Sequence, residues 1–222
     1  EPGTVEVVHI LLREAGITQI LVPANFPFGH ALKFQSLGYQ LFPKREPFYE
    51  QRVVKTAEEF CYIEAAQRAT EQAVAAAHDL LRQASINKDQ LWFEGIPLTS
   101  ERVKKLINVT LMECDCVAQH TIVAGGEQAC DPHNEGSGPL PAHRSIIFDV
   151  FPRSATNRYF ADMSRTVVRG TPSPELKRLY KTVLAAQEEA ITKVKDGADG
   201  KRIHQGICTR FEKAGYKTGL VN

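Results

Sequence analysis

The chain has 222 residues, of which 43% are hydrophobic and 24% charged, and this composition excludes a disordered or collagen-like protein. Its 27 Lys and Arg residues are balanced by 26 Asp and Glu residues, so a strongly basic nucleic-acid-binding surface is not expected. No apolar run approaches the roughly 18 residues of a membrane span, so we expect no membrane partner. The five cysteines are too sparse for a disulfide scaffold and favour free thiols in a cytoplasmic protein.

The first 50 residues predict a small α/β segment. Helical spacing of apolar residues over 5–12 is followed by a short apolar strand over 19–22. A second helix over 29–37 and a second strand over 39–42 complete the pattern. Two prolines in the charged stretch 43–47 then indicate a domain boundary, which we place near residue 50.

A long helix is predicted from a capping box, in which Thr56 precedes Glu59 by three residues. The sequence from there to residue 84 is rich in Ala, Glu, Gln and Leu and contains no Pro or Gly. A second helix is expected from Ser100, and residues 116–124 read as one strand ended by two glycines.

The region after residue 126 predicts a loop followed by a β-hairpin. Glycines and prolines dominate 127–144, whereas 145–151 and 158–168 are β-branched and aromatic runs separated by a turn-rich segment. Two further helices are expected over 174–194 and 201–213, because Pro and Glu suit a helix start and glycines interrupt the pattern between them.

Two aspartates in the predicted hairpin are candidate metal ligands. Asp149 interrupts an apolar strand, and Asp162 lies on the predicted return strand, so both can occupy one face. Directly opposed residues would have Cβ atoms about 4.5–5.5 Å apart, and two carboxylates that close favour a cation between them. Alternatively, Asp149 simply ends a strand and Asp162 pairs with Arg158 or Arg165.

His133 is the candidate catalytic residue from the loop. An imidazole before a predicted strand could donate to a substrate carbonyl or take up a proton near neutral pH. A solvent-exposed loop histidine without a catalytic role is the alternative.

These residues resemble those of a known family, the pita-bread metallopeptidases, which include aminopeptidase P, prolidase, methionine aminopeptidase and creatinase. Ile146–Asp149 resembles the strand with the first metal-binding aspartate, and Asp162–Thr166 resembles the Asp-x-[Ser/Thr]-Arg-Thr element with the second. Ala129–His133 resembles the loop that presents a substrate-side histidine. Arg52–Glu59 looks like the start of the catalytic domain, and 1–50 resembles the end of a creatinase-type N-terminal domain.

The resemblance implies an α+β fold in two domains, with 1–50 as the C-terminal part of the N-terminal domain and 51–222 as an incomplete pita-bread catalytic domain. It further implies two divalent metal ions, Mn²⁺ ahead of Co²⁺ or Zn²⁺, with Asp149 and Asp162 among their ligands. Twelve residues separate the two aspartates, about two more than in the common family pattern, which we attribute to a longer hairpin turn. The family's later histidine and two glutamate ligands are not found before Asn222. Together with the start at Glu1 rather than Met, this leads us to expect a fragment that binds metal poorly and has little activity alone.

The activity implied for the whole protein is an X-Pro aminopeptidase or prolidase-like exopeptidase. Water activated by the two metal ions would attack the peptide bond after the N-terminal residue, with His133 hydrogen-bonded to the substrate. A peptide is thus the expected substrate, and a homodimer is compatible with the family. The main rival is a metal-free pita-bread scaffold that binds peptides or proteins, and a creatinase-like hydrolase without this metal pair is a third possibility.

Overall fold

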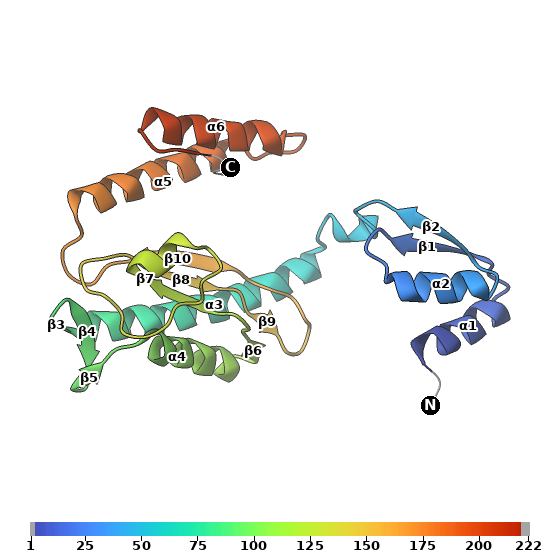
Figure 1. Ribbon diagram of the computed structural model, residues 1–222, viewed down its shortest axis with the longest axis horizontal. Helices are drawn as coiled ribbons and strands as arrows, with labels where there is room; N and C mark the ends of the chain where they lie inside the picture. Colours follow the sequence, from blue (N-terminus) through green and yellow to red (C-terminus); the bar gives the residue numbers. More distant parts are fainter. Residues whose placement is uncertain (1–2, 219–222) are drawn as a thin grey trace. The chain divides into compact units, whose positions relative to one another are not determined.

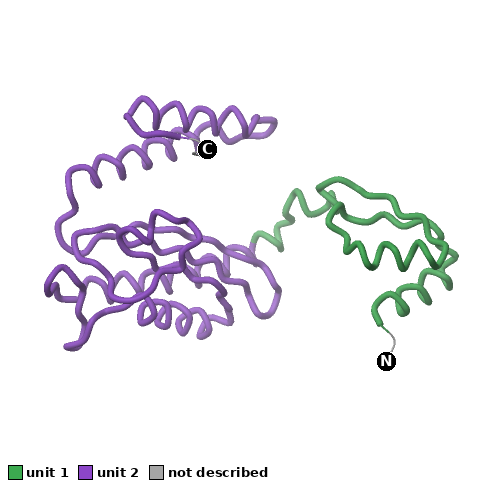
Figure 2. The backbone as a smooth tube through the Cα atoms, in the orientation of Figure 1, with its two compact units in different colours: residues 1–60 green, residues 61–222 purple. Residues whose placement is uncertain are grey.

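The computed structural model describes residues 3–218, which form two compact units that divide between Phe60 and Cys61 (Figure 2). The division falls within the first turn of a long helix, and a domain boundary near residue 50 stays a prediction. None of the helices in the described part of the chain is both long and apolar enough to cross a membrane.

The N-terminal unit alternates helices and strands, as predicted: α1 (Thr4–Glu14), β1 (Gln19–Pro23), α2 (Phe28–Ser36) and β2 (Gln40–Lys44). The two strands pair in parallel, with Gln19 opposite Gln40 (Figure 1). A small core of Val5, Phe34 and Tyr39 lies between the helices and the sheet.

The second unit begins with the long helix α3 (Ala57–Gln83), which the sequence predicted. Its capping box is formed: the backbone N–H of Glu59 donates to Oγ1 of Thr56 at 3.2 Å, and the backbone N–H of Thr56 donates to Oε2 of Glu59 at 2.7 Å. Small residues recur along its buried face: Ala66, Ala69, Ala73 and Ala77.

A three-stranded meander that the sequence analysis did not predict follows α3. It consists of β3 (Ser85–Asn87), β4 (Gln90–Phe93) and β5 (Ile96–Pro97). Its first turn places Lys88 and Asp89 at positive φ, and its second does so with Glu94 and Gly95. These strands are too short for a clear alternation of apolar residues, which explains why they were missed.

The central sheet has the order β10-β8-β7 and is antiparallel throughout, with β7 (Ile122–Gly125), β8 (Ile146–Val150) and β10 (Met163–Val167). The predicted hairpin pairing of the two later strands is therefore confirmed. Buried side chains of α3, of α4 (Ser100–Glu113) and of this sheet form one core, in which Ile107, Val123 and Phe148 are fully buried. The opposite face of the sheet remains available for polar side chains.

Two predicted strands differ from those observed. Residues 116–124 are not one strand: His120 has a φ of 60° and separates β6 (Cys116–Val117), which pairs with β9 (Arg153–Ser154), from β7. The return strand of the hairpin begins at Met163, five residues later than predicted. The segment between β8 and β10 first forms the short strand β9 and a turn, and this delays the start of β10.

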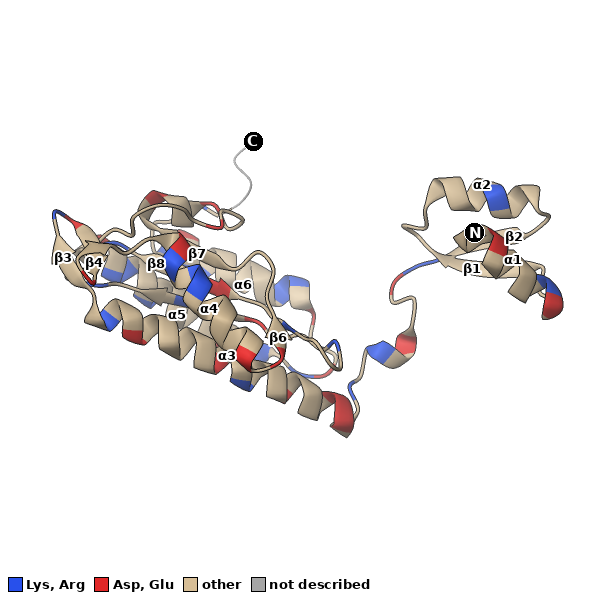
Figure 3. Ribbon diagram, turned by 90° about the horizontal axis from the view of Figure 1, so that it is seen from below, with Lys and Arg blue, Asp and Glu red and all other residues tan. Residues whose placement is uncertain are grey.

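The described chain ends with a helical hairpin, α5 (Pro174–Lys193) and α6 (Gly200–Lys213), as predicted. Ser173 and Asp199 cap the two helices through their side-chain oxygens. Acidic and basic residues are interspersed along the helices of this unit, in agreement with the balanced net charge (Figure 3).

Candidate metal centre

Asp149 lies on β8, the middle strand of the central sheet. Ile146, Phe148 and Val150 of this strand are buried, so alternation places Asp149 on the opposite, half-buried face. Burial of the apolar residues thereby fixes the direction of the carboxylate. The strand is hydrogen-bonded on both sides, which fixes the backbone of Asp149.

The residue directly opposite Asp149 on β10 is Ser164. Its Oγ donates a hydrogen bond to Oδ1 of Asp149 at 2.5 Å. This distance is typical of a hydroxyl bound to an ionised carboxylate, which is a strong, charge-assisted hydrogen bond.

Asp162 lies one residue before β10 and two residues before Ser164. The alternation of the strand therefore continues to the same face as Asp149, but diagonally across the hairpin. Diagonal neighbours are about 7–8 Å apart at Cα, so the directly opposed arrangement expected from the sequence is wrong. The pKa of Asp162 is nonetheless raised, first by partial desolvation and second by the negative charge of Asp149.

The alternative that an arginine neutralises Asp162 finds no support in the structure. Among residues 3–218, no ion pair joins Asp162 to Arg158 or Arg165. Arg165 instead donates to the backbone carbonyl of Ser164 at 2.8 Å. Within the part of the chain that the structure describes, the two carboxylates therefore share one face and neither forms an ion pair with a Lys, Arg or His side chain.

His133 lies in the loop between β7 and β8 and is exposed to solvent. Its backbone N–H donates to Oδ1 of Asp131 at 2.9 Å, which holds the local turn. In the described part of the chain, no hydrogen bond or ion pair links His133 to either aspartate of the hairpin. Its role beside them stays a prediction.

The donor set fits a hard divalent cation, because carboxylate oxygens are the ligands that such ions prefer. It is also incomplete: within the described residues, no group of three or more His, Cys, Asp or Glu side chains converges on one point. Asp149 and Asp162 can thus supply part of a metal site. Full coordination of two ions requires further ligands.

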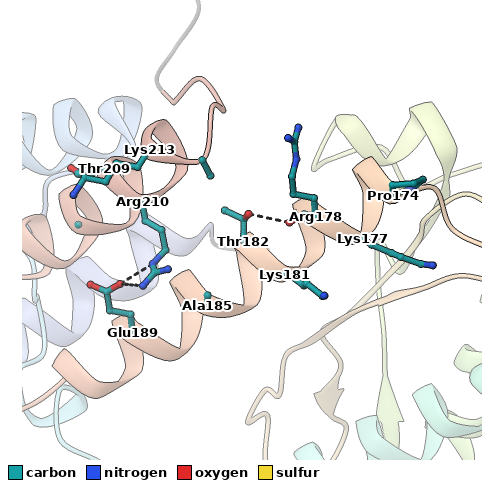
Figure 4. A pocket seen from close by; sticks show the side chains of 12 residues that line it. Pro174, Lys177, Arg178, Lys181, Thr182, Ala185, Glu189, Thr209, Arg210 and Lys213 are labelled. Carbon is teal, nitrogen blue, oxygen red and sulfur yellow. Dashed lines mark hydrogen bonds and ion pairs between the residues drawn. The ribbon is translucent and has the colours of Figure 1, made fainter.

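A groove with a volume of about 970 Å³ lies elsewhere, between α5 and α6. Its one carboxylate, Glu189, already accepts a hydrogen bond from Arg210 at 2.6 Å (Figure 4). Nζ of Lys193 also lies 2.6 Å from this carboxylate. The groove contains no His or Cys side chain. With its single carboxylate engaged by two cations, the groove offers no free metal ligand among its lining side chains, and the aspartate pair remains the candidate metal site.

Ser164 is the residue of this site whose contact the sequence analysis missed. The sequence places it in the Asp162–Thr166 element, but only the strand register shows that it faces Asp149. The register is continuous along β8 and β10, so knowledge of any one pair of opposed residues would have predicted the contact between Ser164 and Asp149. The length of the turn alone could not fix that pair.

A comparison with protein families matches residues 61–221 to metallopeptidase family M24. Among curated proteins, the chain is 27% identical over 166 residues to an Xaa-Pro dipeptidase from Pyrococcus furiosus, covering 74% of this chain and 44% of that protein. It is also 35% identical over 97 residues to an uncharacterized peptidase from Staphylococcus epidermidis, covering 43% of this chain and 27% of the relative.

Solved structures give the same likeness. Prolidase from Pyrococcus furiosus superimposes with a TM-score of 0.80 and 20% identity, covering 100% of this chain and 62% of the prolidase chain. X-Pro aminopeptidase from Thermotoga maritima gives a TM-score of 0.76 and 22% identity, covering 97% and 59%. At these identities the likeness shows the fold, and the chain spans less than two thirds of each of these proteins.

Proposed function

Because this chain belongs to metallopeptidase family M24, we propose that it forms part of a metal-dependent exopeptidase that removes the N-terminal residue of peptides with Pro in the second position. Its fold is the pita-bread fold of prolidases and X-Pro aminopeptidases, as the sequence predicted. The family implies divalent metal ions, and we expect Mn²⁺ ahead of Co²⁺ or Zn²⁺.

One observation carries the proposal at the level of residues. Asp149 and Asp162 share one face of a hairpin, the pKa of Asp162 is raised in part by the charge of Asp149, and no protein cation separates them in the described chain. A divalent cation between the two carboxylates would remove this repulsion. Repulsion between the two carboxylates destabilises the arrangement when no cation is bound, and a bound divalent cation would stabilise it.

When bound, two divalent ions would supply a nucleophilic water at neutral pH and would polarise the scissile carbonyl. Asp149, held by the sheet, would orient its carboxylate toward the ions. Asp162 would contribute a second carboxylate from the less constrained end of the hairpin. His133, exposed on its loop, would donate a hydrogen bond to the carbonyl oxygen of the substrate.

The test is metal content and metal-dependent cleavage in the full-length protein. We expect stoichiometric Mn²⁺ and release of the first amino acid from X-Pro peptides, both lost in Asp149→Asn and Asp162→Asn. Asp196→Asn, in the exposed loop between α5 and α6, is the matched control and should behave as wild type. Comparing a dipeptide with longer peptides separates a dipeptidase from an aminopeptidase.

Absence of stoichiometric metal from the intact protein would refute this function and favour the peptide-binding or protein-binding scaffold. Metal binding without cleavage of any X-Pro substrate would refute the peptidase proposal while keeping the metal site.

A further inference from the structure

Ser164 distinguishes the two carboxylates of the candidate metal centre. Its hydroxyl donates to Oδ1 of Asp149 at 2.5 Å, whereas in the described part of the structure no side chain donates to Asp162. The two aspartates are therefore not equivalent. One is held by a neighbour on the adjacent strand, and the other is not.

The register of the hairpin makes this contact specific. Ser164 is the Cα partner of Asp149, whereas Met163 and Arg165 are opposite Val150 and Phe148. A slip of one residue would turn the hydroxyl to the other face of the sheet. The hydrogen bond thus depends on the same pairing that holds the central sheet together.

The hydrogen bond from Ser164 leaves most of the acceptor capacity of the Asp149 carboxylate unused. An ionised carboxylate accepts hydrogen bonds at both oxygens, and the Ser164 hydroxyl occupies a lone pair of Oδ1. No other side-chain donor to Asp149 is found within residues 3–218. Oδ2 therefore remains available, in an orientation that the Ser164 contact restricts.

We propose that Ser164 is a positioning residue that fixes the Asp149 carboxylate for metal binding. This inference rests on the proposed function and goes beyond it, because it assigns a role to a residue that is not itself a ligand. Hydrogen-bond partners of ligating side chains typically contribute 10–100-fold to metal affinity, because they fix the orientation of the ligand.

The decisive comparison is Ser164→Thr against Ser164→Val in the full-length protein. The two side chains have nearly the same shape and suit a strand equally, but only Thr carries the hydroxyl. We expect Ser164→Val to bind Mn²⁺ at least about 10-fold more weakly than wild type in calorimetric titration, and Ser164→Thr to stay within about threefold. Ser145→Ala, at a serine just before β8 with no side-chain hydrogen bond in the described structure, is the control and should leave the affinity unchanged.

Electron paramagnetic resonance of bound Mn²⁺ gives a readout that a merely structural serine would not affect. We expect the spectrum of Ser164→Val to differ from wild type and that of Ser164→Thr to match it. Melting temperatures of the metal-free variants, compared with wild type, establish that both variants fold.

Three results separate the possible failures. Equal Mn²⁺ affinity in the Thr and Val variants, with binding abolished in Asp149→Asn, would overturn the role of Ser164 and leave the metal site intact. Equally weakened binding in both variants would also overturn it, because the hydroxyl would then be irrelevant. No Mn²⁺ binding by the wild-type protein would instead overturn the proposed function itself.

Discussion

Gly136 lies in the loop that carries His133 and packs against β7 of the central sheet. Its replacement by Ala tests how much this close packing contributes to stability. Gly136 is buried and has a φ of 78°, a conformation that costs an L-residue about 1 kcal/mol. A Cβ atom there would overlap the carbonyl oxygen of Val123 on β7 and would lie 2.6 Å from its carbonyl carbon. The backbone of the loop or of the strand must therefore move.

Two hydrogen bonds limit that movement. The Val123 carbonyl accepts from Oγ of Ser100 at 2.7 Å, and the Gly136 carbonyl accepts from Nζ of Lys104 at 2.9 Å. Losing them costs about 1 kcal/mol each. Together with the backbone strain, we expect Gly136→Ala to lower the free energy of unfolding by about 3 kcal/mol.

Gly138 is the matched control, since it has a φ of 70° but no atom lies within 4 Å of the position that a Cβ would take there. Gly138→Ala should therefore cost about 1 kcal/mol, from strain alone. Urea unfolding followed by the fluorescence of Trp92, the single tryptophan of the sequence, measures both variants. With a slope of about 2 kcal/mol/M, the midpoints should fall by about 1.5 M and 0.5 M. If both variants lowered the urea midpoint by the same amount, the contact with Val123 would not be the cause of the larger loss expected for Gly136→Ala.

Two further predictions concern the last helices and the segment before them. Lys193 and Arg210 lower the pKa of Glu189 from 4.5 to about 2. Because the folded state favours the ionised carboxylate, Glu189 stabilises the α5–α6 hairpin above pH 4.5, and this stabilisation is lost as the pH falls through about 2. Amide exchange in both helices should show this loss, and Glu189→Gln should abolish it. Gly170 has a φ of 104° with its Cβ position 2.5 Å from Nδ1 of His143, so Gly170→Ala should lower the melting temperature by several degrees. Gly197→Ala, at a φ of 73° with nothing within 4 Å, should cost clearly less, and an equal loss would contradict the role of the His143 contact.

The parts of the fold that depend on local interactions could be predicted from the sequence. The capping box of Thr56 and Glu59 closes over four residues, so its hydrogen bonds are determined before any tertiary contact forms. Pairing of the strands that carry Asp149 and Ser164 also followed from composition and turn residues. The pita-bread fold came from the resemblance of these same elements to a family, which the comparisons confirm.

The parts that depend on tertiary contacts could not be predicted. His120 adopts positive φ in a turn that divides one apparent strand, and its ring pairs with Glu135 at 2.7 Å. No local signal at His120 indicates that turn. The register that places Ser164 opposite Asp149 likewise depends on β9, whose partner β6 lies far away in the sequence.

The sheet order gives the two aspartates different freedom of movement. Asp149 is on the middle strand, which is hydrogen-bonded to a neighbour on each side. Asp162 lies just before β10, which within the described residues pairs only with β8. A cation between them would meet one stiff ligand and one compliant ligand. Ions of different radius could then be accommodated by a small displacement of Asp162 without deforming the sheet. Discrimination among divalent ions by size would accordingly be weak at this pair, and selectivity would have to come from the remaining ligands.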